Sequence, residues 1–346
     1  MAHSNRETSP RAQQTAPHIA VARSIEEWIK QVGASSETAV TIGNFDGVHL
    51  GHQKILQAAV DYASLRRSPQ QGPTALVPAV LTFYPHPARV LRPEVAPPLL
   101  MTMDQRLAAF EAAGIGAVLV LPFDRELAQV CAEDFARRYL VEAMRARAVL
   151  VGGNFRFGHR QGGDVNLLRQ LGERWGFEVE IVPPVTVDGM IVSSTAVRKA
   201  VCEGQVEVAR QLLGHAYVLA GEIQPGTNQG RKLVVPTLNL TTQQELLPKL
   251  GVYATEVLLD GNKLYHAATN VGMRPTFDGS RLTVESHLLD FADDRASGPM
   301  EVRFCTRLRD EQKFPNPQAL RAQVLADIER ARDYFQAAGA KTKQDS

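Results

Sequence analysis

Thr41-Ile42-Gly43-Asn44-Phe45-Asp46-Gly47-Val48-His49-Leu50-Gly51-His52 is the stretch that decides the fold of the first half of the chain. It follows a short apolar run and leads into a helical pattern, which predicts a strand, a glycine-containing turn and a helix. His49 and His52 share one face at the start of that helix. A helix start presents unpaired N–H groups and the positive end of the macrodipole. The two imidazoles there therefore indicate a phosphate site rather than an ordinary helix opening.

Composition and charge narrow the class of protein. The 346 residues exceed one ordinary domain, so we expect two. A hydrophobic content of 44% and a charged content of 22% are typical of soluble globular proteins. The net charge of +1 provides no basic field for nucleic acid or for an anionic membrane. No apolar run approaches the roughly 18 residues of a membrane span. Residues 1–19 are predicted to be a disordered tail, and residues 337–346 a second tail.

The three cysteines, Cys131, Cys202 and Cys305, are far apart in the chain and odd in number. Their spacing matches neither a disulfide framework nor a zinc site, which favours a reducing cytoplasm. We therefore expect a cytoplasmic protein with small-molecule substrates and no membrane or nucleic-acid partner. We expect it to act as a monomer or a weak homo-oligomer.

From residue 20 to residue 214 the chain alternates predicted strands with predicted helices. The strands are mostly continuous apolar runs, which is typical of a sheet that is covered on both faces. This alternation predicts an α/β domain with a doubly wound parallel sheet, whose ligands bind at the carboxyl ends of the strands. The predicted strands are Ala39–Ile42, Leu76–Phe83, Ala117–Leu121, Ala148–Val151 and Val179–Val182, and the predicted helices are Gln53–Ser64, Asp104–Ala113, Ala132–Met144 and Val165–Trp175.

From residue 215 to residue 336 the pattern changes to short strands separated by turns rich in Gly, Asn and Asp. Regular short strands of this kind predict a closed antiparallel β-barrel. A final helix, Pro317–Phe335, carries apolar residues at helical spacing, which indicates core packing. The predicted strands of the barrel are Tyr217–Ile223, Val234–Leu240, Val252–Leu259, His266–Val271, Thr283–Leu289 and Val302–Leu308.

A second polar segment, Ser193-Ser194-Thr195-Ala196-Val197-Arg198, complements the histidine turn. Either serine can cap the following helix, and Arg198 lies about one turn from the helix start, where its guanidinium can hold two phosphate oxygens. Alone, the segment is better explained as an ordinary cap with a solvated arginine. Together with the histidines it indicates nucleotidyl transfer. The imidazoles would stabilise charge on the α-phosphate, Arg198 would hold pyrophosphate, and Mg²⁺ would bridge phosphate oxygens. The sequence contains no P-loop motif.

Four segments in this order, GNFDGVHLGH, TFYPHP, VGGNFRFG and SSTAVR, resemble the adenylyltransferase module of bifunctional bacterial riboflavin kinase/FAD synthetase. The resemblance covers most of residues 20–214 and implies adenylyl transfer from ATP to FMN, which gives FAD and pyrophosphate. It implies a catalytic role for His49, His52 and Arg198. It places ATP against Gly43, Phe45, Gly51, Ser194 and Thr195, and the flavin phosphate near Pro85, His86, Pro87, Asn154 and Arg156.

One residue departs from the family pattern. The segment that corresponds to VGGNFRFG commonly has Asp before Phe-Arg-Phe-Gly, and this chain has Asn154. An amide keeps the shape and part of the hydrogen bonding of a carboxylate but loses its charge. An alternative reading is therefore an enzyme with one activity, in which the adenylyltransferase half is a weak or regulatory nucleotide binder.

In the second half, Thr237 and Asn239 project to one face of a predicted strand. A hydroxyl and an amide oxygen are hard ligands that suit Mg²⁺, although cross-strand polar pairing explains them equally well. Glu285 on another predicted strand could deprotonate a substrate alcohol. The turn-rich loop Gly221–Arg231 could approach a phosphate closely, although a plain hairpin loop has the same composition.

With the flanking segments Asn270–Phe277 and Arg307–Phe314, these residues resemble the riboflavin kinase module of the same family. The resemblance implies a six-stranded barrel that moves the ATP γ-phosphate onto the terminal ribityl hydroxyl of riboflavin. It departs from the family at Val234-Val235, where Gly and an aromatic residue are usual. The resemblance assigns Mg²⁺ to Thr237 and Asn239, the catalytic base to Glu285, ATP to Gly226, Gly230 and Arg231, and the flavin to Arg309.

The sequence thus predicts a bifunctional enzyme that uses ATP and Mg²⁺ and whose substrates and products are riboflavin, FMN and FAD. An alternative of another class is a nucleotide-binding module fused to a barrel that binds RNA, because small barrels do bind oligonucleotides. Such barrels need a basic groove and stacking aromatic residues. The near-zero net charge and the aromatic content of 6% argue against this alternative.

Overall fold

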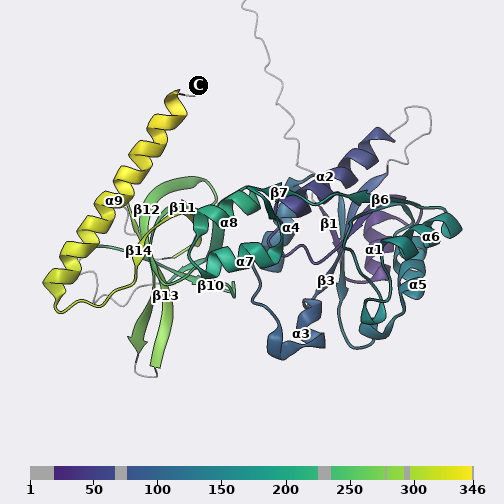
Figure 1. Cartoon of the computed structure of the whole chain (residues 1–346), viewed down its shortest axis with the longest axis horizontal. Coiled ribbons are helices and arrows are strands. Elements are labelled where there is room, and N and C mark those ends of the chain that lie inside the picture. The colour runs from purple at the N-terminus through teal and green to yellow at the C-terminus, as the bar shows by residue number, and fades with distance from the viewer. Residues whose placement is uncertain (1–18, 67–75, 225–234, 277–278, 292–296, 345–346) are drawn as a thin grey trace, which may run out of the picture.

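A six-stranded parallel sheet forms the first half of the protein (Figure 1). The structure is a computed structural model and describes residues 19–66, 76–224, 235–276, 279–291 and 297–344. Every neighbouring pair of strands in this sheet runs parallel. In spatial order the strands are β1 (Ala20–Ala22), β4 (Ala117–Pro122), β3 (Val77–Tyr84), β2 (Thr38–Ile42), β5 (Ala146–Gly152) and β6 (Glu178–Val182).

The chain reverses its direction across the sheet at β2. From β2 it moves to β3 and β4 on one side, and it then returns to place β5 on the other side of β2. In open parallel sheets a ligand crevice forms at such a point, outside the carboxyl ends of the strands. Gly43 directly follows β2 and Asn154 closely follows β5. The connectivity therefore places both motifs at the predicted edge of the sheet.

Helices cover both faces of this sheet. The helical segments are α1 (Ile25–Val32), α2 (Leu50–Leu65), α3 (Pro87–Leu91), η1 (Pro93–Val95), α4 (Met103–Ala112), η2 (Leu127–Gln129), α5 (Ala132–Phe135), the π-helical η3 (Ala136–Ala143), η4 (His159–Gln161) and α6 (Val165–Trp175). Trp28 of α1, Leu140 of η3 and Leu171 of α6 belong to the core on one face. Leu56 of α2 and Phe110 of α4 belong to the core on the other. The sheet is thus doubly wound.

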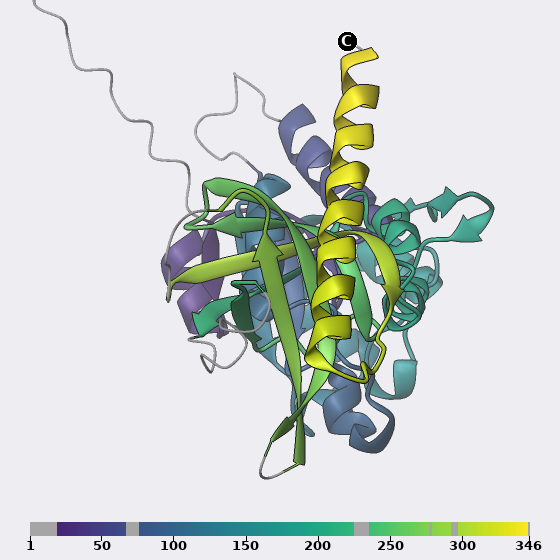
Figure 2. The ribbon, with the colours of Figure 1, turned by 90° about the vertical axis from the view of Figure 1, so that its left-hand side faces the viewer.

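A closed six-stranded antiparallel barrel forms the second half, and the long helix α9 (Pro317–Gln344) crosses its outer surface (Figure 2). Ile328 and Ala331 of α9 pack against Ala254 and Ala268 on the outside of the barrel. In spatial order the strands are β10 (Leu238–Thr242), β13 (Gly279–Leu288), β12 (Lys263–Thr276), β11 (Gly251–Leu259), β14 (Pro299–Asp310) and β9 (Tyr217–Gln224), which closes onto β10.

The two halves share one hydrophobic core at their junction. After the small hairpin β7 (Thr186–Val187) and β8 (Met190–Ile191), the chain forms α7 (Ser194–Cys202) and α8 (Val206–Leu213). Apolar side chains of α7 and α8 belong to the same buried cluster as the interior of the barrel. Since α7 also carries the predicted Ser194–Arg198 segment, this site segment rests on the barrel.

The predicted fold class is confirmed: a doubly wound parallel sheet precedes a six-stranded antiparallel barrel and a C-terminal helix. Several details differ from the sequence-based prediction, and α1, α3, α8 and the hairpin of β7 and β8 were not predicted. The edge strand β1 was missed because three residues are too short to show a period. The strand predicted from Val234 begins at Leu238, because Pro236 has no N–H for the ladder. Strands β12 and β13 are longer than predicted.

The final helix also differs from the prediction, because it continues beyond Phe335 to Gln344. The described part of the predicted C-terminal tail, 337–344, is therefore helical. Almost all of the predicted N-terminal tail lies outside the described residues.

Candidate active sites

The histidine turn lies at the carboxyl end of β2. His49 is the N-cap of α2, and its Nδ1 accepts a hydrogen bond from the backbone N–H of His52 at 3.3 Å. An accepting Nδ1 leaves the proton of neutral His49 on Nε2, which fixes the tautomer. The two imidazole rings stack with their centroids 3.7 Å apart. Phe45 meets the His52 ring edge-on at 5.1 Å, so the turn holds both imidazoles together at the start of the helix.

The backbone of this turn adopts rare conformations. Phe45 and Val48 have φ angles of 51° and 37°, which bulky and β-branched residues seldom adopt. A Cβ atom on Gly47 would lie 2.7 Å from a neighbouring leucine side chain, and one on Gly51 would lie 3.2 Å from the His49 ring. Strained backbone of this kind persists only where surrounding contacts hold it, and it is concentrated at functional sites.

Both imidazoles are uncharged at neutral pH. Burial lowers the pKa of His49 to about 4. Burial also lowers the pKa of His52 well below its ordinary value, and the neighbouring His49 and Arg106 lower it further. Nδ1 of His52 is buried and makes no hydrogen bond within the described residues. The turn can therefore donate N–H groups to an anion without carrying a positive charge of its own.

Asp46 connects the histidine turn to helix α7. Its side chain is only 2% exposed, and its Oδ2 accepts a hydrogen bond from Nη2 of Arg198 at 2.7 Å. Its Oδ1 accepts the backbone N–H of Leu100 at 2.9 Å. The hydroxyl of Ser194 donates to the backbone carbonyl of Asp46 at 2.7 Å. Arg198 and Ser194 thus reach the histidine turn as predicted, while the side chain of Thr195 is exposed.

A buried arginine, Arg106, lies behind the turn. It projects from α4, is 1% exposed, and donates from Nη1 to the carbonyl of Asn44 at 2.8 Å. Burial lowers its pKa, and the negative charge of Asp46 opposes this shift. Arg106 therefore ties α4 to the strained turn. Sequence analysis missed it because an arginine in a helix with a solvated face carries no distinguishing signal.

The predicted flavin-side residues divide into two groups. Pro85 follows a cis peptide bond, and His86 caps α3 by accepting the N–H of Ala88 at 3.2 Å. Burial lowers the pKa of His86, the negative charge of Asp46 opposes this shift, and the charges of Arg106 and Arg198 lower the pKa further. His86 therefore lies within the electrostatic field of Asp46 in the histidine turn and of its neighbouring arginines.

Asn154 and Arg156 form the second group. They are exposed on the segment that follows β5, and Nη1 of Arg156 contacts Oδ2 of Asp164 at 3.4 Å. The structure thus places His86 near the histidine turn, and it places Asn154 and Arg156 at the carboxyl edge of the sheet without a contact to that turn among the described residues.

We expect stability to depend on pH through His49. The folded protein binds the His49 proton less tightly than the unfolded chain does, because its pKa falls from 6.5 to about 4. The contribution of His49 to the free energy of unfolding is therefore fully present above pH 6.5 and is lost as the pH falls toward 4. Between pH 8 and pH 5 the expected loss is about 2 kcal/mol for this group.

Urea unfolding of the wild type and of His49→Asn at both pH values tests this expectation. Asparagine caps helices well, so this substitution removes the titrating ring and keeps the cap. His49→Asn should show a smaller dependence on pH than the wild type, and an equal dependence in both proteins would contradict the assignment.

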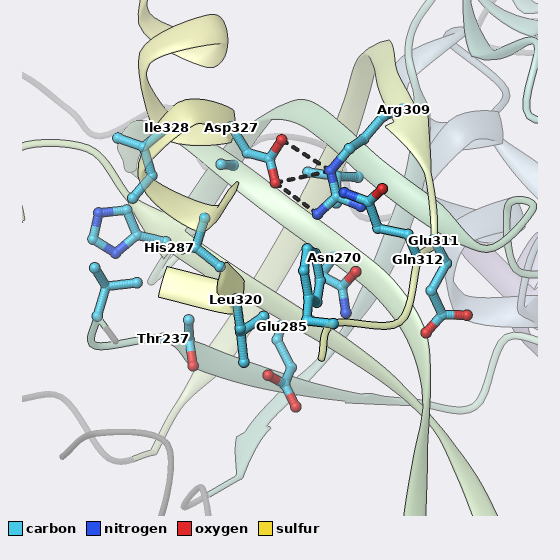
Figure 3. A pocket seen from close by; sticks show the side chains of 15 residues that line it. Thr237, Asn270, Glu285, His287, Arg309, Glu311, Gln312, Leu320, Asp327 and Ile328 are labelled. Carbon is cyan, nitrogen blue, oxygen red and sulfur yellow. Dashed lines mark hydrogen bonds and ion pairs between the residues drawn. The ribbon is translucent and has the colours of Figure 1, made fainter. Parts of the chain in front are cut away.

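The second site is a cavity of about 330 Å³ between the outer surface of the barrel and α9 (Figure 3). The predicted residues Thr237, Glu285 and Arg309 all line it. The barrel and the segment that enters α9 supply most of the polar groups, and α9 supplies Asp327 and the apolar residues Leu320, Val324 and Ile328. The complete lining is Val235, Thr237, Val252, Ala268, Asn270, Glu285, His287, Arg309, Glu311, Gln312, Phe314, Leu320, Val324, Asp327 and Ile328.

Strand register aligns the polar groups of this site. Asn239 of β10 lies directly opposite Glu285 of β13, and Glu285 lies opposite Asn270 of β12. Residues directly opposite in antiparallel strands share one face, so the three side chains form a row on the outside of the barrel. Thr237 lies just before β10 and lines the same cavity. The register thus brings together Thr237, Asn239 and Glu285, and it adds Asn270, which was not singled out from the sequence.

The oxygen donors of this row, together with the hydroxyl of Thr237, fit Mg²⁺. A hydroxyl, two amide oxygens and a carboxylate are hard ligands, and Mg²⁺ usually takes few protein ligands together with substrate phosphates and water. The described part of the chain contains no cluster of three or more His, Cys, Asp and Glu side chains that could hold a metal ion. The predicted ATP-binding residues Gly226, Gly230 and Arg231 lie outside the described residues.

Arg309 is held by a buried ion pair rather than pointing freely into the cavity. Its Nη2 and Nε donate to the carboxylate of Asp327 at 2.7 and 2.9 Å (Figure 3). Its Nη1 donates to the carbonyl of Asp310 at 2.8 Å. Asp327 is 4% exposed and also accepts from Gln323 at 2.9 Å. These contacts fix α9 against β14, so Arg309 positions the wall of the cavity as well as lining it.

Replacing Asp327 with asparagine is expected to destabilise the protein by about 3 kcal/mol, because breaking a buried ion pair leaves Arg309 without its counter-charge. Urea unfolding measures this loss. Arg332→Ala is the matched control on the same helix. Its partner Asp290 is 85% exposed, so its loss should cost less than about 1 kcal/mol. Equal losses in the two variants would show that the Arg309–Asp327 pair does not hold the helix.

Comparison with known proteins identifies both halves. The FAD synthetase family model matches residues 32–196, and the riboflavin kinase family model matches residues 213–335. The chain also superposes on the crystal structure of a protein described as a macrolide-efflux protein from Streptococcus pneumoniae. That match has a TM-score of 0.79 and 29% identity, and it covers 91% of this chain and 99% of the other. In the described part of this chain, none of the helices combines the length and apolarity needed to cross a membrane.

Curated relatives match almost the whole chain. The bifunctional riboflavin kinase/FMN adenylyltransferase of Escherichia coli K12 is 35% identical over 86% of this chain and 92% of its own length. The enzyme of the same description from Pseudomonas fluorescens is 38% identical over 84% of this chain and 91% of its own length. This chain therefore belongs to the family of bifunctional riboflavin kinases/FMN adenylyltransferases.

Proposed function

We propose that this enzyme of flavin cofactor biosynthesis makes FMN in the barrel cavity and FAD at the histidine turn. The observation that carries the proposal is the separation of two polar sites. The Glu285 row lies under α9 on the barrel. The stacked His49 and His52 face Asp46 and Arg198 at the edge of the sheet. The half with the histidine turn matches the FAD synthetase family model, and the half with Glu285 matches the riboflavin kinase family model.

In the kinase step, Glu285 accepts the proton of the terminal ribityl hydroxyl of riboflavin, and that oxygen attacks the γ-phosphorus of ATP. ADP leaves, and FMN remains. A half-buried carboxylate beside the amides of Asn239 and Asn270 is well placed to orient an alcohol. Thr237 and Asn239 would hold Mg²⁺, which supplies charge neutralisation for the phosphates when it is bound.

In the adenylyl step, a phosphate oxygen of FMN attacks the α-phosphorus of ATP, and pyrophosphate leaves. His49 and His52 donate N–H groups to the charge that grows on the α-phosphate. Arg198 uses Nη2 for Asp46 and Nε for the carbonyl of Pro98, at 2.7 and 2.9 Å, so its plane is fixed before ATP binds and its β- and γ-phosphates leave as pyrophosphate. Asn154 and Arg156 at the carboxyl edge of the sheet would approach the flavin phosphate.

We further propose a cytoplasmic protein that acts as a monomer or weak homo-oligomer on small molecules, without nucleic-acid or membrane partners. The division of the residues 20–214 and 215–336 between the two activities belongs to the same proposal. It is supported by the end of α8 at Leu213 and the start of β9 at Tyr217.

Chromatographic separation of riboflavin, FMN and FAD after incubation with ATP and Mg²⁺ tests the proposed function. Appearance of FMN and then FAD is the expected result. A reaction that stops at FMN, even when FMN is supplied, favours the enzyme with one activity and an idle adenylyltransferase half. Tight, salt-sensitive RNA binding without flavin chemistry favours the RNA-binding alternative.

A further inference from the structure

One short segment of the first half, residues 98–101, is held between the adenylyl site and the barrel. On one side, the N–H of Leu100 donates to Asp46 at 2.9 Å, and the carbonyl of Pro98 accepts from Nε of Arg198 at 2.9 Å. Asp46 is also the partner of Arg198. The position of residues 98–101 therefore sets the orientation of the arginine that faces pyrophosphate in the proposed adenylyl step.

The barrel holds the other side of the same segment. The carbonyl of Leu100 accepts from Nε2 of Gln244 at 3.1 Å and from the hydroxyl of Tyr217 at 3.2 Å. Gln244 and Tyr217 are buried, with exposures of 7% and 3%. Because Leu100 is itself buried, its N–H and its carbonyl link Asp46 directly to two side chains of the second half.

Glu245, the next residue of the barrel, holds a different part of the adenylyl site. Its carboxylate accepts the N–H of Leu99 at 2.8 Å and pairs with Arg89. Arg89 belongs to α3, which His86 caps. Gln244 thus contacts the segment that orients Arg198, and Glu245 contacts α3, which is capped by His86, a residue predicted on the flavin side.

We infer that Gln244, Tyr217 and Glu245, which lie in the riboflavin kinase half, are positioning residues of the adenylyl site. Gln244 and Tyr217 act through Leu100 and Asp46 on Arg198, and Glu245 acts through Arg89 on α3. This inference rests on the proposed function of the histidine turn. It also gives a physical reason for the two modules to share one chain, because the barrel completes the neighbouring site.

Substitutions of Gln244 and Tyr217 should change the kinetics of FAD formation differently from a substitution of Glu245. Gln244→Met combined with Tyr217→Phe removes both side-chain hydrogen bonds to the carbonyl of Leu100. It also removes the bonds of Gln244 to Gln105, Val218 and Ala220 and the bond of Tyr217 to Leu246. The kcat of FAD formation from FMN should fall by about tenfold. An interaction that acts on the transition state lowers kcat and kcat/KM together. Glu245→Ala should mainly raise the KM for FMN, by roughly threefold to tenfold. In all these variants kcat of the kinase reaction should stay within about twofold of the wild type.

The kinase reaction of the same protein reports whether the barrel remains folded. Glu207→Ala is the matched control, because it removes a junction contact, between α8 and Thr306 and Arg307 of β14, that does not involve residues 98–101. It should leave both activities near the wild-type values. If Gln244→Met/Tyr217→Phe fails to fold, Tyr217→Phe alone and the surface variant Glu245→Ala decide the question.

The inference is overturned if the variants lose both activities in parallel, which would mean ordinary destabilisation, or if adenylyl transfer is unchanged in a variant with intact kinase activity. A wild-type protein that makes no FAD would instead refute the proposed function. The two failures are therefore distinguishable in one set of assays.

Discussion

Glu285→Gln is expected to reduce the rate of FMN formation from riboflavin by about 10³-fold, because a general base contributes roughly 10²- to 10⁴-fold. Glutamine keeps the size and the carbonyl oxygen of the side chain but cannot accept the proton of the ribityl hydroxyl. Externally supplied FMN should still be converted to FAD, because the stacked imidazoles lie in the other half of the chain. Separate assays with riboflavin and with FMN measure the two rates.

Glu311→Gln is the matched control in the same cavity. Glu311 is a second carboxylate of the lining, and its Oε1 accepts the backbone N–H of Met273 at 3.1 Å. Glutamine can still accept that bond, so the kinase rate should change by less than about tenfold. Equal effects of the two substitutions would indicate that the loss follows from the charge of the cavity rather than from a base at Glu285. Loss of both activities in a folded Glu285→Gln protein would contradict the assignment of one activity to each half.

His49→Ala combined with His52→Ala is expected to reduce FAD formation by at least about 10²-fold, because the loss of one transition-state donor alone costs roughly 10²- to 10³-fold. Kinase activity should persist, so FMN should accumulate during incubation with riboflavin. The centroids of the two stacked rings lie 3.7 Å apart, and both imidazoles are neutral. Alanine has no side-chain N–H group, so the double variant loses both donors to the phosphate.

The control for this pair addresses the helix cap. His49→Ala also removes the N-cap of α2, which costs about 1 kcal/mol of stability. Ser24→Ala removes the N-cap of α1, where the serine hydroxyl accepts the N–H of Glu27 at 3.2 Å. This variant should lose similar stability and keep both activities. If it loses FAD formation to the same extent, destabilisation rather than loss of donors explains the histidine result.

Much of the fold could be predicted because its elements are bounded by local signals. Helix α6 spans the predicted residues Val165–Trp175, since Asp164 caps its start and Gly176 ends it in a left-handed conformation. Helix α2 begins at Leu50, three residues before the predicted start at Gln53, because His49 caps it within the glycine-containing turn. The π-helical segment η3 within the predicted helix Ala132–Met144 was not predictable, since its hydrogen-bond pattern leaves no signature in the sequence.

Sequence motifs predicted individual site residues, but they did not predict the contacts between residues that are distant in the chain. Asp46 lies inside the histidine motif, yet its partner Arg198 is 152 residues away, so their ion pair is a product of the tertiary fold. The same holds for Arg309 and Asp327, which meet because α9 packs on β14. Arg106 and Gln244 have no local signal, because each acts through backbone carbonyls that only the folded chain brings near.

Incubation of the protein with riboflavin and ATP labelled at either the α- or the γ-phosphorus tests the central claim, which is that two separate sites break ATP at different bonds. The account predicts that γ-label enters both FMN and FAD, whereas α-label enters FAD alone. Glu285→Gln supplied with FMN should still incorporate α-label into FAD. If the γ-label reaches FMN but the α-label stays in ATP and ADP and never enters FAD, the account is contradicted, because only one of the two sites would then perform chemistry.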